Sequence, residues 1–181
     1  DIMDVKAALC AAIAKTSNFK IAEFSTWPVL YEFTARRPAT NGSPSTEVLV
    51  KPDGFIRIHE NKPDGGLSEH TYFLEVDRST ETLDTLALRA ACYNDYYRRG
   101  GLAVRNGQPA AAYKDFPFRV LFVLKSAERR DNIARRLLQN NPPVLTQVWL
   151  TTSPEIANNP LGAIWVRPVD YHARNRVTVP E

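Results

Sequence analysis

The spacing of apolar residues divides the chain into segments of helical period and segments of strand period. Apolar positions recur every three or four residues, as on one face of a helix, in residues 5–15, 80–99 and 126–140. Alternating or short continuous apolar runs, which favour strands, occupy residues 19–24, 47–60, 70–77, 119–125, 146–151 and 164–169. This order of elements predicts an α/β fold with a mixed central sheet flanked by helices on both faces.

Turn and capping residues indicate where these elements end. The sequence Asn-Lys-Pro-Asp-Gly-Gly at residues 61–66 is a strong turn signal and predicts a hairpin between the strands on either side of it. Ser79 or Thr80 is expected to cap the second helix, and Ser126 the third. Pro52-Asp53-Gly54 interrupts the first strand of the hairpin, so we expect a bend or bulge there.

Three segments show weaker patterns. Residues 26–33 have a mixed pattern that we interpret as a short helix. Residues 35–46 are rich in turn formers and are predicted to form a loop. Residues 102–116 are predicted to form a polar connection ahead of the next strand.

Composition and charge narrow the class of protein. The chain has 181 residues, of which 44% are hydrophobic and 24% charged, which predicts one domain over residues 1–181 with a sizeable core. It has no apolar run of the roughly 18 residues that a membrane span requires, so no membrane partner is expected. The formal net charge of +3 permits nucleic-acid binding without requiring it.

Cysteine, histidine and tryptophan positions suggest structural roles. Cys10 and Cys92 are isolated in apolar helical settings and are predicted to be reduced and buried, which favours a cytoplasmic location. The histidines lack the spacing of metal ligands; they are His59, His70 and His172. The tryptophans lie in apolar patterns and are expected in the core; they are Trp27, Trp149 and Trp165.

The strand over residues 70–77 ends with two carboxylates that share one of its faces. Glu75 and Asp77 are two residues apart, and hairpin pairing would bring Asp53 close to them. Carboxylates from neighbouring strands suit Mg²⁺ or Mn²⁺. Such an ion can activate water and neutralise charge on a phosphodiester. Two structural alternatives remain: Asp53 before Gly54 forms a turn, or Glu75 forms a salt bridge with an arginine such as Arg78 or Arg89.

These residues resemble a nuclease superfamily. Pro52-Asp53 on one strand and Glu75-Val76-Asp77 on the next, followed by a helix, resemble the PD-(D/E)XK nucleases. The resemblance implies a PD-(D/E)XK core in which Asp53, Glu75 and Asp77 are catalytic residues that bind Mg or Mn. Arg89 and Tyr93 lie where some of these nucleases carry a glutamine and a tyrosine beside the site.

The order of several further segments is similar to the replication-relaxation family of bacterial proteins, which are linked to plasmid replication and DNA relaxation. The segments are residues 73–81, the tyrosine-bearing helix after them, residues 118–124 and residues 159–165. The resemblance implies a DNA partner, a bacterial cytoplasmic location and a winged-helix region ahead of the present chain. Because the chain opens at Asp1 within a helical pattern, we expect it to be the C-terminal part of a longer protein.

One departure from the nuclease pattern leaves several hypotheses open. Asp77 occupies the position where the nuclease motif has its lysine. Arg89 can supply a cation to a phosphate, but its high pKa excludes it as a general base. The chain is therefore either a metal-dependent DNA endonuclease or an inactive module of the same fold that binds DNA or a protein partner. A third hypothesis is an accessory module whose DNA contact lies wholly in a winged helix ahead of the present chain. This domain would then form a homodimer or bind a replication or mobilisation protein.

Arginines near the ends of two predicted helices are candidates for DNA contact, since guanidinium groups bind phosphate in a bidentate manner. The candidates are Arg78, Arg98, Arg99, Arg129 and Arg130. The alternative is structural: cations at helix C-termini offset the helix dipole, and neighbouring acids pair with arginines on a solvated face.

Overall fold

The computed structural model describes residues 2–29, 31–37, 45–173 and 175–180. Its elements follow the chain in the order α1 (Ile2–Ile13), β1 (Phe19–Ser25), β2 (Phe33–Arg37), β3 (Thr46–Val50), β4 (Gly54–Asn61), β5 (Leu67–Val76), α2 (Leu83–Arg98), α3 (Gly101–Arg105), η1 (Ala110–Asp115), β6 (Arg119–Leu124), α4 (Ala127–Leu138), β7 (Val148–Thr152), α5 (Ser153–Asn158) and η2 (Pro168–Asp170). No helix among these residues is long and apolar enough to cross a membrane.

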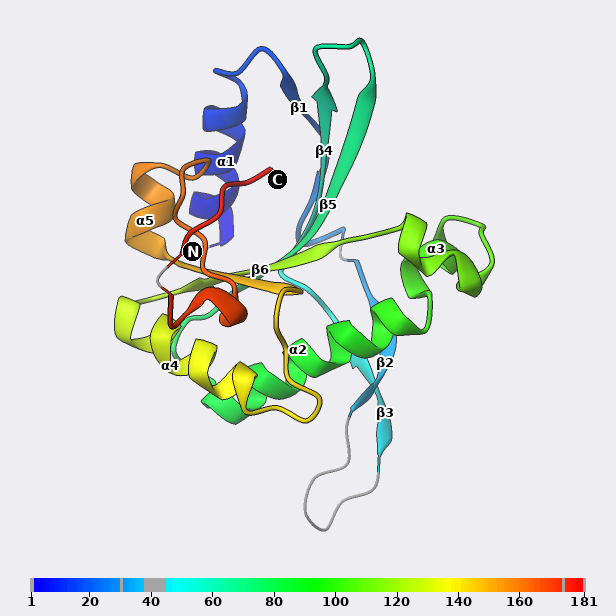
Figure 1. Ribbon diagram of the computed structural model, residues 1–181, viewed down its shortest axis with the longest axis vertical. Coiled ribbons are helices and arrows are strands. Elements are labelled where there is room, and N and C mark those ends of the chain that lie inside the picture. The colour runs from blue at the N-terminus through cyan, green and yellow to red at the C-terminus, as the bar shows by residue number, and fades with distance from the viewer. Residues whose placement is uncertain (1, 30, 38–44, 174, 181) are drawn as a thin grey trace.

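A five-stranded mixed sheet forms the centre of the molecule, with the strand order β1-β4-β5-β6-β7 (Figure 1). The β1–β4 and β4–β5 pairs are antiparallel, whereas β5–β6 and β6–β7 are parallel. The crossover from β5 to β6 runs through α2, as parallel pairing requires a long connection. The predicted α/β class and mixed sheet are confirmed.

Helices cover both faces of the sheet, with α1 and α5 on one face and α2 and α4 on the other (Figure 1). Alternation along β5 divides the core in two: Tyr72 and Leu74 pack with α1 and α5, while Phe73 packs with α2 and α4. Because Glu75 follows Leu74, its side chain lies on the α2 face, deep in the molecule. This placement is the basis of the candidate site.

The strand β3 belongs to a second sheet instead of continuing into β4. It pairs with β2 in a separate two-stranded sheet that contacts α2. The predicted helix at residues 26–33 is therefore wrong. In the predicted loop at residues 35–46, residues 35–37 belong to β2 and residue 46 begins β3. Residues 38–44 of that loop lie outside the described part. The reason for the second sheet is aromatic packing: Tyr31 stacks on Phe55 and Phe33 packs on Tyr96.

Several element boundaries also differ from prediction. Thr82 caps α2, since its side chain accepts a hydrogen bond from the Thr85 amide, and neither Ser79 nor Thr80 does. Ser126 caps α4 as expected. Residues 102–116 are largely helical, because they contain most of α3 and all of η1. Trp27 is 78% exposed, so only the other two tryptophans lie in the core.

Candidate functional site

The pairing of β4 with β5 brings Asp53 to Glu75, as the hairpin prediction required. Gly54 lies opposite Leu74, so Asp53 is beside the end of β5. Its Oδ2 accepts a hydrogen bond of 2.8 Å from the backbone amide of Val76. Asp53 is therefore held against the end of β5 by this hydrogen bond and does not form a free turn at the surface.

Both carboxylate oxygens of Glu75 are bonded to side chains of α2. Tyr93 Oη donates to Oε1 at 2.5 Å, and Arg89 Nη1 donates to Oε2 at 2.9 Å. Arg89 and Tyr93 lie one turn apart, which places them on the same helix face. Arg89 Nη2 also donates to Glu81 Oε1 at 2.8 Å. The salt-bridge alternative for Glu75 is thus present, and Arg89 is its partner.

Burial controls the protonation of this group. The Glu75 side chain is 3% exposed, and loss of water raises its pKa to about 7 against the lowering influence of Arg89 and Tyr93. Burial also raises the pKa of Asp53, while the hydrogen bond from Val76 lowers it. The pKa of Tyr93 lies well above its usual range for the same reason, so its hydroxyl remains a donor to Glu75.

Asp77 forms a separate ion pair. Arg129 on α4 donates through Nε to Oδ2 and through Nη2 to Oδ1, the second bond measuring 3.0 Å. The Ser79 amide adds a third bond, 3.0 Å from Oδ1. The Asp77 side chain is 3% exposed. Asp77 thus links β5 to α4 where the nuclease motif would have its lysine.

The remaining candidate arginines are dispersed. Arg78 lines the same cavity as Glu75 and is exposed. Arg130 is 8% exposed and is bonded to Asp131 and Glu155. Arg98 and Arg99 lie at the end of α2, where Arg99 is 3.5 Å from both Glu47 and Asp95. Their contact with DNA stays a prediction, and the five residues do not form one patch; they are Arg78, Arg98, Arg99, Arg129 and Arg130.

The site opens into a cavity of about 230 Å³. Lys51 and Glu81 line it together with Asp53, Glu75 and Arg89. Sequence reasoning did not include Lys51 or Glu81. The sequence could have indicated Lys51, because it lies two residues before Asp53. It could not have indicated Glu81, because the position of that residue depends on the turn between β5 and α2.

Comparison with known proteins identifies the family. A family model described as replication-relaxation matches residues 3–109. The chain belongs to the replication-relaxation family. No curated protein and no solved structure matches it. The region matched in this replication-relaxation protein runs from α1 through α3 and includes Asp53, Glu75 and Arg89, whereas Arg129 lies outside it.

The donor set of this replication-relaxation protein does not fit a divalent ion in the arrangement described. Glu75 uses both oxygens on Tyr93 and Arg89, and Asp77 uses both on Arg129. Among the residues that the structure describes, no cluster of three histidine, cysteine, aspartate or glutamate side chains is placed to hold a metal. The guanidinium groups of Arg89 and Arg129 already neutralise these carboxylates, as a bound metal ion would do. Mg or Mn binding stays a prediction.

Proposed function

We propose that this protein is a DNA-associated module in plasmid replication or relaxation, with a PD-(D/E)XK-like core that binds DNA and does not hydrolyse it. One observation carries the second half of the proposal: both carboxylates of Glu75-Val76-Asp77 are ion-paired with arginines of the chain itself. The first half rests on membership of the replication-relaxation family.

The order of elements supports a nuclease-like core. A helix, three antiparallel strands, a helix and a parallel strand correspond here to α1, β1, β4, β5, α2 and β6. The β2–β3 sheet is inserted between the first and second strands of this unit. Asp53 then precedes β4 and Glu75 lies near the end of β5, so the two carboxylates meet at one end of these central strands, beside α2.

The chemistry of the site argues against hydrolysis. Cleavage of a phosphodiester needs a group that activates water and a cation that neutralises the developing charge. Arg89 cannot accept a proton at neutral pH. Its charge also faces two carboxylates, at 2.9 Å from Glu75 and 2.8 Å from Glu81, so little of it is available to a phosphate.

The testing experiment combines DNA binding with plasmid nicking. Purified protein is incubated with supercoiled plasmid and Mg²⁺ or Mn²⁺, beside the Asp53→Asn/Glu75→Gln variant. We expect binding that weakens with salt, and no nicking by either protein. Absence of DNA binding at low salt would overturn the DNA-associated role. Nicking by the native chain that the double variant loses would overturn the non-hydrolytic role.

A second candidate, metal-dependent hydrolysis, is favoured by one feature of Asp53. Its Oδ1 has no hydrogen bond within the described residues, and Asp53 lines the same cavity as Glu75. Calorimetric titration with Mn²⁺ distinguishes the two candidates. Heat of binding in the native chain that is absent from the Asp53→Asn/Glu75→Gln variant would support this candidate, and equal silence from both would exclude it.

A further inference from the structure

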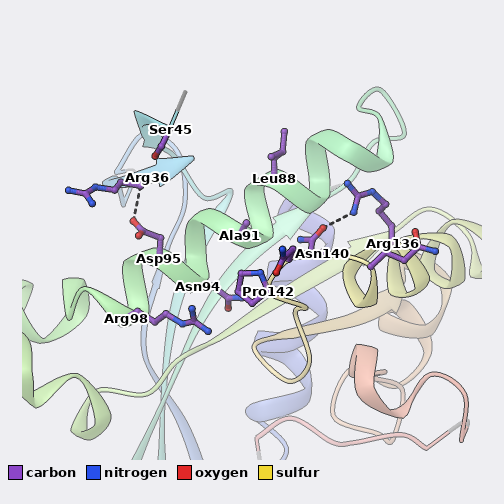
Figure 2. A pocket seen from close by; sticks show the side chains of 12 residues that line it. Arg36, Ser45, Leu88, Ala91, Asn94, Asp95, Arg98, Arg136, Asn140 and Pro142 are labelled. Atoms are coloured by element: carbon purple, nitrogen blue, oxygen red, sulfur yellow. Dashed lines mark hydrogen bonds between the residues drawn. The ribbon is translucent and has the colours of Figure 1, made fainter. Parts of the chain in front are cut away.

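Two further cavities continue the carboxylate cavity along α2. One, of about 490 Å³, lies between α2 and β3 and shares Lys51 and Arg89 with the carboxylate cavity. The other, of about 440 Å³, lies where α2 faces the β2–β3 sheet and the segment after α4, and it shares Leu88 with the first (Figure 2). The shared residues make these two cavities one groove, called here the α2 groove, which adjoins the carboxylate cavity at Lys51 and Arg89.

The α2 groove is strongly cationic. Its cationic lining residues are Arg36, Arg37, Lys51, Arg89, Arg98 and Arg136. Asp95 is the one acidic residue among its described lining residues, and it is already bonded to the Arg36 amide at 2.7 Å and lies 3.5 Å from Arg99. Three of the six cations are paired with acids outside the groove, Lys51 with Glu32, Arg89 with Glu75 and Glu81, and Arg136 with Asp84. The positive charge of the other three is uncompensated by described residues.

Three of these cations are available to a ligand. Arg36, Arg37 and Arg98 are exposed, and their guanidinium groups form no ion pair with any described residue. Arg136 is bound by Asp84 at 2.6 Å and Asn140 at 2.7 Å, and Arg89 by the site carboxylates. Arg36 and Arg37 lie on β2 and Arg98 ends α2, so unpaired guanidinium groups border the groove on both sides, where they can bind phosphates.

Amide side chains line the end of the groove near Pro142 (Figure 2). Asn140 is fixed by Arg136 and by its bond to the Ala87 carbonyl, 3.3 Å away. Asn94 is half-buried and its amide has no hydrogen bond with a described residue. An amide both donates and accepts, so it can pair with the edge of a base. Leu88 supplies an apolar wall, and the volume is within the range of small-ligand sites.

We infer that the α2 groove binds single-stranded DNA, with phosphates on Arg36, Arg37 and Arg98 and one unpaired base against Asn94. Asn94 lines a cavity, and a base enters a cavity only when it is unpaired or flipped out of the stack, which favours a single strand over a duplex. The groove directs this strand toward Glu75. The inference rests on the proposed DNA association and adds the form of DNA and the path it takes.

The test measures binding of a fluorescein-labelled mixed-sequence single strand, and of the duplex of the same sequence, over a salt series. The groove variant is Arg36→Gln/Arg98→Gln. The control, Lys15→Gln/Arg135→Gln, removes two exposed charges that do not line the groove. We expect the native chain to prefer the single strand. In the groove variant affinity falls at least tenfold, and the slope of log K against log salt flattens by about 1.4.

A second variant separates base contact from charge. Asn94→Ala is expected to lower single-strand affinity about tenfold while leaving the salt slope unchanged, because no phosphate contact is lost. A groove variant with the affinity and slope of the control, or tighter binding of duplex by the native chain, would overturn the inference while leaving DNA association intact. Failure of the native chain to bind either DNA would overturn the proposed function itself.

Discussion

The contribution of Glu75 to the free energy of unfolding depends on pH. Burial raises the pKa of its carboxyl from 4.5 to about 7, so the folded state keeps a proton that the unfolded state has released. Between these values the unfolded chain binds fewer protons, and the free energy of unfolding must fall as pH rises. The stabilisation is complete below pH 4.5 and is lost as pH rises through 7, at about 1.4 kcal/mol for each pKa unit.

Urea denaturation at a series of pH values from 4.5 to 7 compares the native chain with Glu75→Gln. Glutamine cannot ionise, so the variant should lack this component of the pH dependence and gain stability relative to the native chain as pH rises. The pKa of Asp53 is raised as well, mainly by burial, so Asp53 leaves a slope of the same sign in both proteins. Parallel curves for the two proteins would show that Arg89 keeps Glu75 ionised throughout.

At the scale of elements, the turn after α2 positions the helix that carries the site. Gly100 has φ of +70°, in the left-handed region, and a Cβ there would lie 2.2 Å from the Ala110 carbonyl oxygen. Gly107 has φ of +73°, and no atom lies within 4 Å of the same position. Alanine variants at the two glycines therefore distinguish the cost of backbone strain, present at both positions, from the cost of steric overlap, present only at Gly100.

Gly107→Ala should cost about 1 kcal/mol, because strain alone opposes a side chain in this conformation. Gly100→Ala should cost about 2–4 kcal/mol, since overpacking against the η1 backbone adds to the strain. Urea denaturation of both variants at one pH gives the comparison. Equal losses would mean that the α2–α3 turn and η1 move apart freely, and that the turn does not restrain α2.

At the scale of the whole molecule, two apolar clusters share one sheet. Leu9 belongs to the cluster under α1 and α5, and Leu137 to the cluster under α2 and α4. The strands β4, β5, β6 and β7 supply alternate residues to opposite faces of the sheet, so loss of one cluster removes the support of the other. We expect residues 1–181 to unfold as one cooperative unit, as the single-domain prediction requires.

Leu9→Ala and Leu137→Ala should each lower the free energy of unfolding by about 2–5 kcal/mol. In both variants, far-ultraviolet circular dichroism and tryptophan fluorescence should give coincident transitions. Trp149 and Trp165 report on the Leu9 cluster only, so the Leu137 variant provides the stringent case. Separate midpoints in that variant would indicate two independently folding parts.

Homodimer formation stays a prediction that sedimentation at varied concentration can test.

Local pattern was sufficient for much of the fold and part of the site. The turn at residues 61–66 and the Ser126 cap depend on near neighbours, and both lie where they were predicted. The periodicity of apolar residues located the five central strands and the helices α1, α2 and α4, whereas the strand predicted at residues 164–169 is reduced to isolated bridges at Trp165 and Val166. The approach of Asp53 to Glu75 followed from the same hairpin. The shared face of Arg89 and Tyr93 followed from helical spacing alone.

Contacts between distant elements were decided by tertiary structure. The Asp77–Arg129 pair joins residues 52 positions apart, and it depends on how α4 packs beside the end of β5. The second sheet formed because buried aromatic residues near Phe33 hold β2 against α2. The α2 groove likewise combines cations from β2, α2 and the residue that follows β3. The sequence by itself determined the strands of the central sheet, including the one that carries Glu75, and the helices α1, α2 and α4, because these depend on periodicity. Helix packing and strand pairing decided which charges meet there.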